Sequence, residues 1–486
     1  MNPATPSTGT PPASPIPGPA CPWAGLPLLR AMARDYLGFT AGLQRDHGDL
    51  VAMRLGPERS LDLFHPDDVR CALVDHAEHL VRWERGVEVF AQTFGQGLLV
   101  AEGEAWRRQR RMLAPGFLPR RVQGYAGLMV DAARGALDAA LPADRDEAEQ
   151  PVEALFNALT MDVILRTLFS SRAPEVARAA ADATQVLSRA AMQEMFWPVS
   201  LPAWLPLPHQ IAKRRAGAVL HGLIDAQIAA RRALPAEQAP TDDLLAMLLA
   251  VRDEDGSGLS AAELHDQCLV MFQAGHETSA TALLWWSWLM ATHPEAAARA
   301  RDEVDTVLAG RDPGPADLAA LPWLGATLKE AMRLYPPVAA LMSRRVRRPF
   351  TLAGHPVAAG TVLRITPWVI QRDARWFPEP EAFRPERFLG AEAERPRSAW
   401  MPFGVGPRVC IGQHFALLEM TLVAALLLQR CTLHPADGAT LPVPRMHVTL
   451  RPAGPLRLRL RRRGAAPPQS APCASSVSTP PASRNA

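Results

Sequence analysis

Cys410 lies in a sequence setting that favours its thiolate form. It belongs to the run FGVGPRVCIG, residues 403–412, directly before a long apolar pattern typical of a helix. Backbone N–H groups and the dipole at a helix N-terminus stabilise a thiolate there. The glycines let the backbone pass close to a large flat group, and Arg408 can neutralise an anionic substituent on it. The run therefore predicts a haem held by a cysteine thiolate.

This run has two other interpretations, an inert core cysteine and a dinucleotide-binding loop. A single cysteine beside an apolar helix is usually an inert core residue, but here six positions fit the motif together. A dinucleotide-binding loop, G-x-G-x-x-G, would need a third glycine where the chain has Val409. The six positions are Phe403, Gly404, Gly406, Arg408, Cys410 and Gly412.

A second candidate site lies in a long helix that we predict from Ser260 to Thr292. Ser260 and Glu263 form a capping-box pattern at its start, and Pro294 ends it. At about 1.5 Å per residue, such a helix is long enough to cross a whole domain. The polar run AGHETS, residues 274–279, interrupts its apolar middle.

Gly275 and Thr278 stand out within that polar run. A glycine in a helix costs about 1 kcal/mol relative to alanine, so a local gain must offset it. The Thr278 hydroxyl can donate to the carbonyl of Ala274, which loosens the helix and opens a groove. An exposed polar step on a solvated face is the alternative. A zinc site fails because H-E-x-x-H would need a histidine at Ala280.

These two runs resemble those of the cytochrome P-450 family, in which a cysteine thiolate is the proximal ligand of the haem iron. The resemblance implies that Cys410 is that ligand, that Arg408 contacts a haem propionate and that Phe403 packs under the ring. It also implies that Thr278 hydrogen-bonds dioxygen or a water beside it. Glu277 would help to relay protons from solvent.

Further motifs appear in the family's order, over about residues 25–460. Glu330 and Arg333 lie one helical turn apart and can pair. Alone, such a pair is usually a surface salt bridge that stabilises little. In the family, an arginine resembling Arg387 completes a buried triad, which serves folding and haem incorporation.

Trp106 and Arg110 share one helical face and resemble the family's pair of propionate donors. A basic, solvated helix is the alternative. Arg344 stands where a further propionate arginine is expected, but the adjacent Arg345 leaves the register open by one residue. Two propionates carry two negative charges, which three arginines and one indole N–H would match.

More arginines surround the helix of Trp106, and they indicate either simple solubility or a docking face for an acidic electron donor. The resemblance implies a separate donor, of ferredoxin or flavodoxin type with its reductase, because the sequence contains no flavin or nicotinamide domain. The arginines are Arg107, Arg108, Arg111, Arg120 and Arg121.

Composition limits the class of protein. With 486 residues, 48% of them hydrophobic, the chain can bury a large core, and its net charge of +3 gives no sign of nucleic-acid binding. Its six scattered cysteines favour a reducing compartment without a disulfide framework. No stretch reaches the ~18–20 apolar residues of a membrane-spanning helix. These features resemble the soluble bacterial members of the family, so we expect a cytoplasmic protein.

The organisation predicted from the sequence is one haem domain, residues 23–463, between disordered Pro-rich tails at 1–22 and 464–486. Apolar spacing of three to four residues predicts mostly helices, and short alternating runs predict a minor sheet. The class is therefore mainly α with a minor β region (α+β); the helix-rich triangular prism of the P-450 fold is implied by the resemblance alone. Helices are predicted at 103–115, 150–170, 172–196, 209–233, 260–292, 294–309, 316–335 and 412–430, and strands near 49–55, 60–64, 350–353, 361–364, 447–451 and 456–461.

The substrate side is the least specified. Residues 83–99 are predicted to form a loop that lines the pocket. A second apolar cluster resembles the lid of an access channel, although an ordinary interhelical core is the alternative. Both regions favour a lipophilic substrate such as a fatty acid, a terpenoid or a polyketide-like molecule. The lid residues are Met192, Met195, Phe196, Trp197 and Trp204.

The function implied by the resemblance is that of a haem-thiolate monooxygenase with haem b. It would insert one atom of O2 into a lipophilic small molecule, by hydroxylation or epoxidation. A haem sensor or carrier without turnover and an enzyme that uses hydrogen peroxide directly are the alternatives. Both are disfavoured by Glu277 and Thr278, because a proton-relay pair is needed when O2 must be cleaved.

Overall fold

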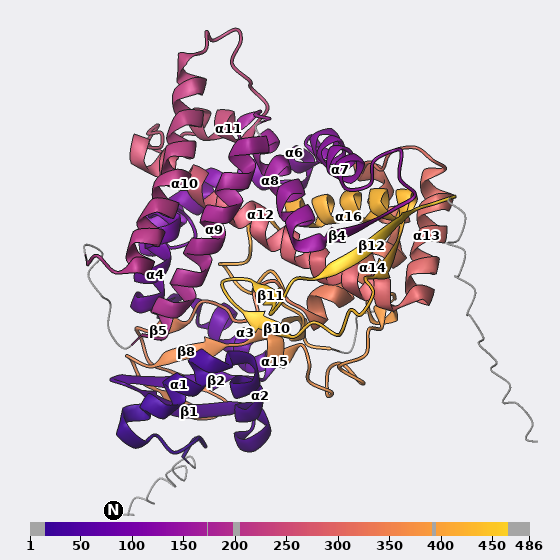
Figure 1. Ribbon diagram of the computed structural model, residues 1–486. Helices are drawn as coiled ribbons and strands as arrows, with labels where there is room; N and C mark the ends of the chain where they lie inside the picture. Colours follow the sequence, from indigo (N-terminus) through magenta and orange to yellow (C-terminus); the bar gives the residue numbers. More distant parts are fainter. Residues whose placement is uncertain (1–14, 173, 198–204, 391–394, 465–486) are drawn as a thin grey trace, which may run out of the picture.

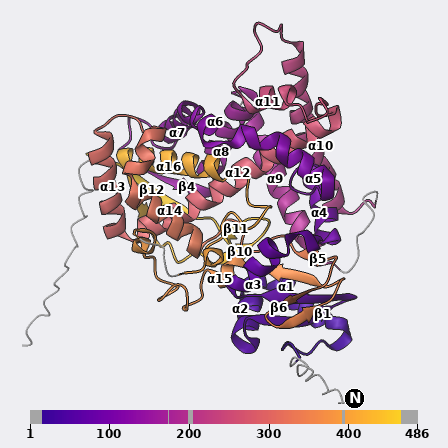
Figure 2. The same ribbon diagram turned by 180° about the vertical axis from the view of Figure 1, so that it is seen from behind.

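The computed structural model describes residues 15–172, 174–197, 205–390 and 395–464. Helices make up most of it, and small sheets lie beside and between them, so the predicted mainly α class with a minor β region is confirmed (Figures 1 and 2). The predictions for residues 1–14, Trp204 and residues 465–486 fall outside the described part of the chain. Among the described helices, none is long and apolar enough to span a membrane.

Seven of the eight predicted helices are present within a few residues of their expected ends, whereas the one predicted at 316–335 is divided into the short turn η5 and helix α14, which begins at Pro322. Further helices precede the predicted ones and lie between them. The α-helices are α1 (Leu26–Arg34), α2 (Tyr36–His47), α3 (Pro66–Arg70), α4 (Glu84–Phe94), α5 (Gly103–Leu113), α6 (Pro119–Gln123), α7 (Ala126–Ala140), α8 (Val152–Phe169), α9 (Pro174–Met195), α10 (Pro208–Ala233), α11 (Leu244–Ala250), α12 (Ala261–Thr292), α13 (Pro294–Leu308), α14 (Pro322–Leu334), α15 (Pro367–Ile370) and α16 (Gln413–Arg430). Short helical turns are η1 (Pro22–Gly25), η2 (Cys71–Asp75), η3 (Ala77–His79), η4 (Ala114–Phe117), η5 (Pro315–Ala320), η6 (Pro385–Phe388) and η7 (Arg397–Ala399).

Helix α12 runs through the centre of the molecule in both views (Figures 1 and 2). It begins with the predicted capping box: the Ser260 hydroxyl accepts from the N–H of Glu263 at 3.2 Å, and the Glu263 carboxylate accepts from the N–H of Ser260 at 2.8 Å. Helix α8 packs closely against it at Gly275, where a Cβ would lie 2.8 Å from Cδ1 of Ile164. This close packing of two helices stabilises the fold and offsets the cost of a glycine inside a helix.

The largest sheet joins strands that are far apart in the sequence. Its order is β1 (Leu50–Leu55), β2 (Glu58–Leu63), β8 (Val362–Ile365), β5 (Arg344–Val346) and β3 (Leu80–Arg82), with β2 and β8 parallel and the other pairs antiparallel. The smaller sheets are β4 (Glu147–Pro151), β12 (Arg457–Arg462) and β9 (Cys431–Pro435); β10 (Pro444–Met446) and β11 (Leu450–Pro452); and β6 (Phe350–Leu352) and β7 (His355–Val357). In Figure 1 the large sheet lies at the lower left with α1 and α2, apart from most of the helices.

The ion-pair triad predicted around Glu330 is present on α14. Glu330 and Arg333 are completely buried, and Arg333 donates to both carboxylate oxygens of Glu330, at 2.7 and 2.8 Å. Arg387 donates to the same carboxylate at 3.2 Å. Arg333 also holds three backbone carbonyls, and so ties α14 to the segment that leads to η6: those of Gln371, Pro380 and Ala382.

Two predictions about local structure are wrong. Residues 84–94 are not a loop but helix α4, because Gly86, Val89 and Phe94 repeat at helical spacing and form a buried face. The N-terminal disordered tail was also predicted too long at its inner end. There, the carbonyl of Pro17 accepts from the N–H of Ala52 on β1 at 2.8 Å.

Candidate active site

The run 403–412 forms a tight loop directly before α16. The N–H of Cys410 donates to the carbonyl of Phe403 at 2.9 Å and closes this loop. Gly404 and Gly406 both have a φ of +78°, a conformation that side chains disfavour. At Gly406 a Cβ would also lie 2.1 Å from the carbonyl oxygen of Leu73, so this position has no room for any side chain.

The Cys410 thiol faces an interior space. The Cys410 side chain is accessible, but protein surrounds it and removes it from bulk water. This burial raises the pKa of the thiol. The backbone N–H of Gly412 and the guanidinium of Arg110 act in the opposite direction and lower the pKa of Cys410, because both favour the thiolate. An accessible sulfur in a desolvated setting indicates an internal void next to the loop.

A cluster of three arginines, one buried and two half-buried, lies near this loop. Arg82 on β3 and Arg344 on β5 are directly opposite each other in the antiparallel register, and Arg408 approaches them from the cysteine loop. The described carboxylate nearest to them belongs to Glu102, which is 2.8 Å from Arg408 and 3.8 Å from Arg82. Like charges directly opposite each other destabilise a sheet. One carboxylate cannot balance three guanidinium groups, so the cluster lacks negative charge.

The titration behaviour of the cluster reflects the same shortage of negative charge. Burial and the neighbouring cations lower the pKa of Arg344 and of Arg408 to about 10, and lower the pKa of Arg82 well below its usual value. The Nε and Nη1 atoms of Arg82 are buried without a hydrogen-bond partner in the described part of the chain. An anionic group that enters this space would satisfy these donors.

The structure resolves the register of Arg344 and Arg345. Consecutive strand residues point to opposite faces, and Arg345 pairs with Glu58 at 2.6 Å and with Glu84 at 2.9 Å. Arg344 points the other way, toward Arg408 and Glu102. Arg344, and not Arg345, therefore belongs to the arginine cluster.

Helix α5 brings Trp106 and Arg110 to the same region. The guanidinium of Arg408 lies 4.0 Å above the centre of the Trp106 ring, which is a cation–π contact. Arg110 is close enough to Cys410 to influence its titration. Phe403, half-buried, packs edge-on against Trp400 with ring centres 6.5 Å apart.

The groove predicted in α12 has the expected hydrogen bond. The Thr278 hydroxyl donates to the carbonyl of Ala274 at 3.0 Å, so its lone pairs remain available to another donor. Ala274 is exposed within a helix that is otherwise mostly buried here, and both residues line a cavity.

Glu277, next to Thr278, is buried but firmly anchored. Its Oε1 accepts from Thr449 at 2.7 Å and from Arg451 at 2.8 Å, with Ser188 farther away at 3.4 Å. Arg451 also pairs with the partly exposed Glu153 at 2.9 Å, so one ion-pair network joins Glu277 to a carboxylate at the surface. Oε2 of Glu277 has no hydrogen bond within the described residues, and Glu277 lines the cavity.

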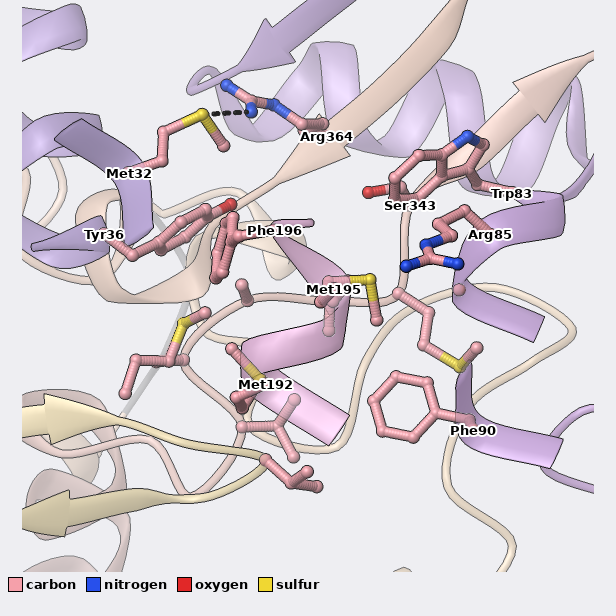
Figure 3. A pocket seen from close by; sticks show the side chains of 18 of the residues that line it. Met32, Tyr36, Trp83, Arg85, Phe90, Met192, Met195, Phe196, Ser343 and Arg364 are labelled. Carbon is pink, nitrogen blue, oxygen red and sulfur yellow. Dashed lines mark hydrogen bonds between the residues drawn. The ribbon is translucent and has the colours of Figure 1, made fainter. Parts of the chain in front are cut away.

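The cavity beside Thr278 has a volume of about 430 Å³ and walls that are mostly apolar. Figure 3 shows Trp83, Arg85 and Phe90 on one side and Met32, Tyr36 and Arg364 on the other. The described residues of the predicted lid line it and are half-buried rather than packed in a core: Met192, Met195, Phe196 and Trp197.

Most of the arginines predicted to form a docking face already have acidic partners. On α6, Arg120 is exposed and Arg121 is half-buried. The ion pairs join Arg107 to Glu104, Arg108 to Asp253 and Glu263, and Arg111 to Asp253 and Glu254. The positive charge available to a partner is therefore smaller than the sequence indicates.

No sequence motif predicted a role for Arg82 or Glu102. Arg82 ends a strand of only three residues, too short for an alternating pattern to reveal which way its side chain points. Glu102 precedes α5 in a loop, and its proximity to Arg408 depends on tertiary packing.

Comparison with known proteins agrees with this geometry. The Cytochrome P450 family model matches residues 15–459. Cyclooctat-9-en-7-ol 5-monooxygenase of Streptomyces melanosporofaciens is 36% identical, over 87% of this chain and 92% of the relative. Pentalenene oxygenase of Streptomyces avermitilis is 33% identical over 90% and 95%, and Putative cytochrome P450 132 of Mycobacterium tuberculosis is 33% identical over 88% and 94%.

The match covers nearly the whole described part of the chain and includes both the cysteine loop and the α12 groove. The predictions of family, fold class, cofactor and enzyme class are confirmed by it. The chain belongs to the cytochrome P450 family: it is a monooxygenase that binds haem b and acts on a lipophilic substrate with O2 and a separate electron donor.

Proposed function

We propose that the protein is a haem-thiolate monooxygenase of terpenoid-like lipophilic molecules, with Cys410 as the iron ligand. The observation that carries the proposal is the setting of Cys410, a thiol that faces an interior space close to a cluster of anion-deficient arginines. The relatives named cyclooctat-9-en-7-ol 5-monooxygenase and pentalenene oxygenase favour a terpenoid substrate.

The residues around this space fit haem b. Three arginines, the buried Arg82 and the half-buried Arg344 and Arg408, share one nearby carboxylate among the described residues, Glu102, which leaves an excess of two positive charges. The two propionates of haem b carry two negative charges and would balance this excess. Trp106 and Arg110 on α5 are placed to add an indole N–H and a further guanidinium.

Thiolate-bound haem supplies the activation of O2 and the transfer of one oxygen atom to the substrate. The protein holds the thiolate through the cysteine loop. Its apolar cavity excludes water and orients the substrate.

Glu277 and Thr278 would manage the protons that this chemistry consumes. Oε1 of Glu277 is held by Arg451 and Thr449, so Oε2 is the atom free to carry a proton to the cavity. The Thr278 hydroxyl already donates to the carbonyl of Ala274, so its oxygen can accept a hydrogen bond from a water in the groove. That water would receive the proton from Glu277. An arginine cannot relay protons, so Glu277 would be recharged by water and not through Arg451.

The first test of the proposal is the carbon monoxide difference spectrum of the reduced, haem-loaded protein. A thiolate ligand, as the family resemblance implies, gives a Soret band near 450 nm. We expect this band in the wild type and its loss in Cys410→Ser, while Cys268→Ser, at a buried thiol on α12, keeps it. A band that survives Cys410→Ser would refute the assignment.

The proton-handling roles require a separate test. We expect Thr278→Ala to divert electrons from product to hydrogen peroxide when a surrogate reductase supplies them. Thr292→Ala is the matched control, because Thr292 makes the same bond to the carbonyl four residues earlier, at 2.9 Å, but at the end of α12. Equal coupling of electron use to product in both variants would rule out a special role for Thr278.

We also propose a ferredoxin- or flavodoxin-type donor that docks near α6, where Arg120 is exposed, and a cytoplasmic location. The five cysteines of the described residues are all free thiols, which supports a reducing compartment. Charge reversal of Arg120 should slow reduction at low salt without changing the carbon monoxide spectrum.

A further inference from the structure

The charges in the wall of the cavity are unusually well balanced. Among the described residues that line it, four carry a formal charge at neutral pH: two acids and two arginines. They are Glu58, Arg85, Glu277 and Arg364. The undescribed segment 198–204, PVSLPAW, contributes no ionisable side chain wherever it lies.

Each of the two acids is already paired with an arginine. Glu58 holds Arg345 at 2.6 Å and also accepts from the indole N–H of Trp83 at 3.2 Å. Glu277 holds Arg451 at 2.8 Å. Neither acid is left to attract a cationic substrate.

Arg364 is equally well satisfied. It faces Asp62 across the parallel strands β2 and β8, and the two groups form three hydrogen bonds of 2.7 to 3.0 Å. Two methionine sulfurs, of Met32 and Met53, contact its guanidinium at 3.1 and 3.4 Å. Asp62 is fully buried, so a substrate anion could not displace it without leaving a buried carboxylate unpaired.

Arg85 is the least firmly held of the four. It pairs with Glu88 at 3.3 Å and donates to the carbonyl of Glu194, at the end of α9, at 2.7 Å. Glu88 is about half exposed, which weakens the pair by solvent screening. If any residue of the cavity were to bind an anion, Arg85 would be that residue.

Nearby cations outside the lining do not alter this balance. Burial and three cations lower the pKa of His447, on the cavity wall: Arg451, which is already paired with Glu277 and Glu153, and then Arg445 and Arg189. Arg189 and Arg445 are exposed, so water and salt screen their charge from the cavity, whereas the charge of Arg451 is balanced by its two carboxylate partners. Burial and these cations together keep His447 neutral at pH 7.

We infer that the cavity selects an uncharged lipophile and rejects the carboxylate form of otherwise similar molecules. The inference rests on the proposed function and narrows its substrate class. A carboxylate that entered would leave water without gaining an unpaired cation, which is strongly unfavourable. An alcohol or hydrocarbon of the same shape would bury its apolar surface without that penalty. Free fatty acids are thereby excluded as preferred substrates, and neutral terpenoids remain.

The test uses two matched pairs of ligands on the haem-loaded enzyme: dodecanol with dodecanoic acid, and geranylgeraniol with geranylgeranoic acid. Binding is followed by the shift of the haem Soret band between about pH 6 and pH 8. If only the protonated acid binds, its apparent Kd rises about tenfold per pH unit, because a carboxyl group with a pKa near ~4–5 is ionised throughout this range. The alcohols should show no such slope.

Glu88→Gln provides the gain-of-function arm. It removes the carboxylate partner of Arg85, so the acids should bind at least several-fold more tightly and with a smaller pH slope. Glu237→Gln, at an exposed glutamate after α10, is the matched control and should change the apparent Kd of neither the acids nor the alcohols. An acid that binds wild type as tightly as its alcohol at pH 8, and that loses this affinity in Arg85→Gln, would overturn the inference. Absence of the 450 nm band would instead overturn the proposed function on which it rests.

Discussion

Replacement of Glu419 by glutamine offers the sharpest thermodynamic test of this structure. Glu419 lies on α16, nine residues after Cys410, and is completely buried. Neither of its carboxyl oxygens has a hydrogen-bond partner among the described residues. Burial raises the pKa of Glu419 from 4.5 to about 8, and the nearby hydroxyl of Ser279 on α12 offsets this rise only in part.

The raised pKa of Glu419 sets the sign and the size of the effect. Between pH 4.5 and about 8 the folded protein keeps the proton that the unfolded chain has lost, so stability falls as pH rises through this window. At about 1.4 kcal/mol per pKa unit, the full penalty is about 5 kcal/mol, reached above pH 8. About half of it, 2–3 kcal/mol, develops between pH 6 and pH 8.5.

Glutamine has almost the same shape but cannot ionise. The Glu419→Gln protein should therefore lack this part of the pH dependence, whatever fixed cost its amide group adds. Urea unfolding of the haem-loaded proteins at about pH 6 and pH 8.5 measures it, with the exposed Glu237→Gln as the control for loss of a glutamate. Between these two pH values, the free energy of unfolding should fall by about 2–3 kcal/mol more in the wild type and the control than in Glu419→Gln.

Parallel pH dependence in all three proteins would refute the argument. It would mean that Glu419 ionises near its ordinary pKa, so that water or a rearranged Ser279 solvates the carboxylate inside the folded protein.

The remaining predictions concern the buried triad and the haem pocket. Glu330→Gln leaves a buried arginine unpaired and should lower the free energy of unfolding by about 3–5 kcal/mol in urea titrations, whereas the exposed Glu386→Gln should change it little. Gly406→Ala should abolish haem incorporation, measured by the ratio of Soret to protein absorbance, because its Cβ would collide with a backbone carbonyl. Gly404→Ala has the same φ but no neighbour within 4 Å, so it should lose much less haem, and equal loss would show that strain alone matters. Arg82→Gln should speed the transfer of haem to apomyoglobin several-fold, and unchanged transfer would exclude Arg82 from the propionate site.

Local patterns in the sequence were sufficient for the long helices and for the chemistry of two motifs. The capping box at Ser260, the bond from Thr278 to Ala274 and the pair of Glu330 with Arg333 all join residues within four positions of each other. Such contacts follow from helical geometry alone, so one chain segment is enough to predict them.

Other features depend on segments that meet only in the folded protein. Helix α4 was predicted as a loop because glycines, which are typical of loops, occur at positions 86, 95 and 97, although Gly86, Val89 and Phe94 lie on the buried face of a helix. The fixed hydrogen bonds to Oε1 of Glu277 come from Thr449 and Arg451, more than 170 residues away. No local pattern can reveal such partners.

The sequence by itself determined which residue types this protein has for its chemistry: a cysteine at a helix start, an acid–alcohol pair in a long helix and a set of arginines. Only the tertiary structure decided which arginines meet. Strand register sets Arg82 opposite Arg344 and turns Arg345 toward Glu58, and the pairing of β3 with β5 joins segments more than 250 residues apart. The physical reason is that a helix fixes its own neighbours through local hydrogen bonds, whereas charge balance in a cavity is a sum over distant segments.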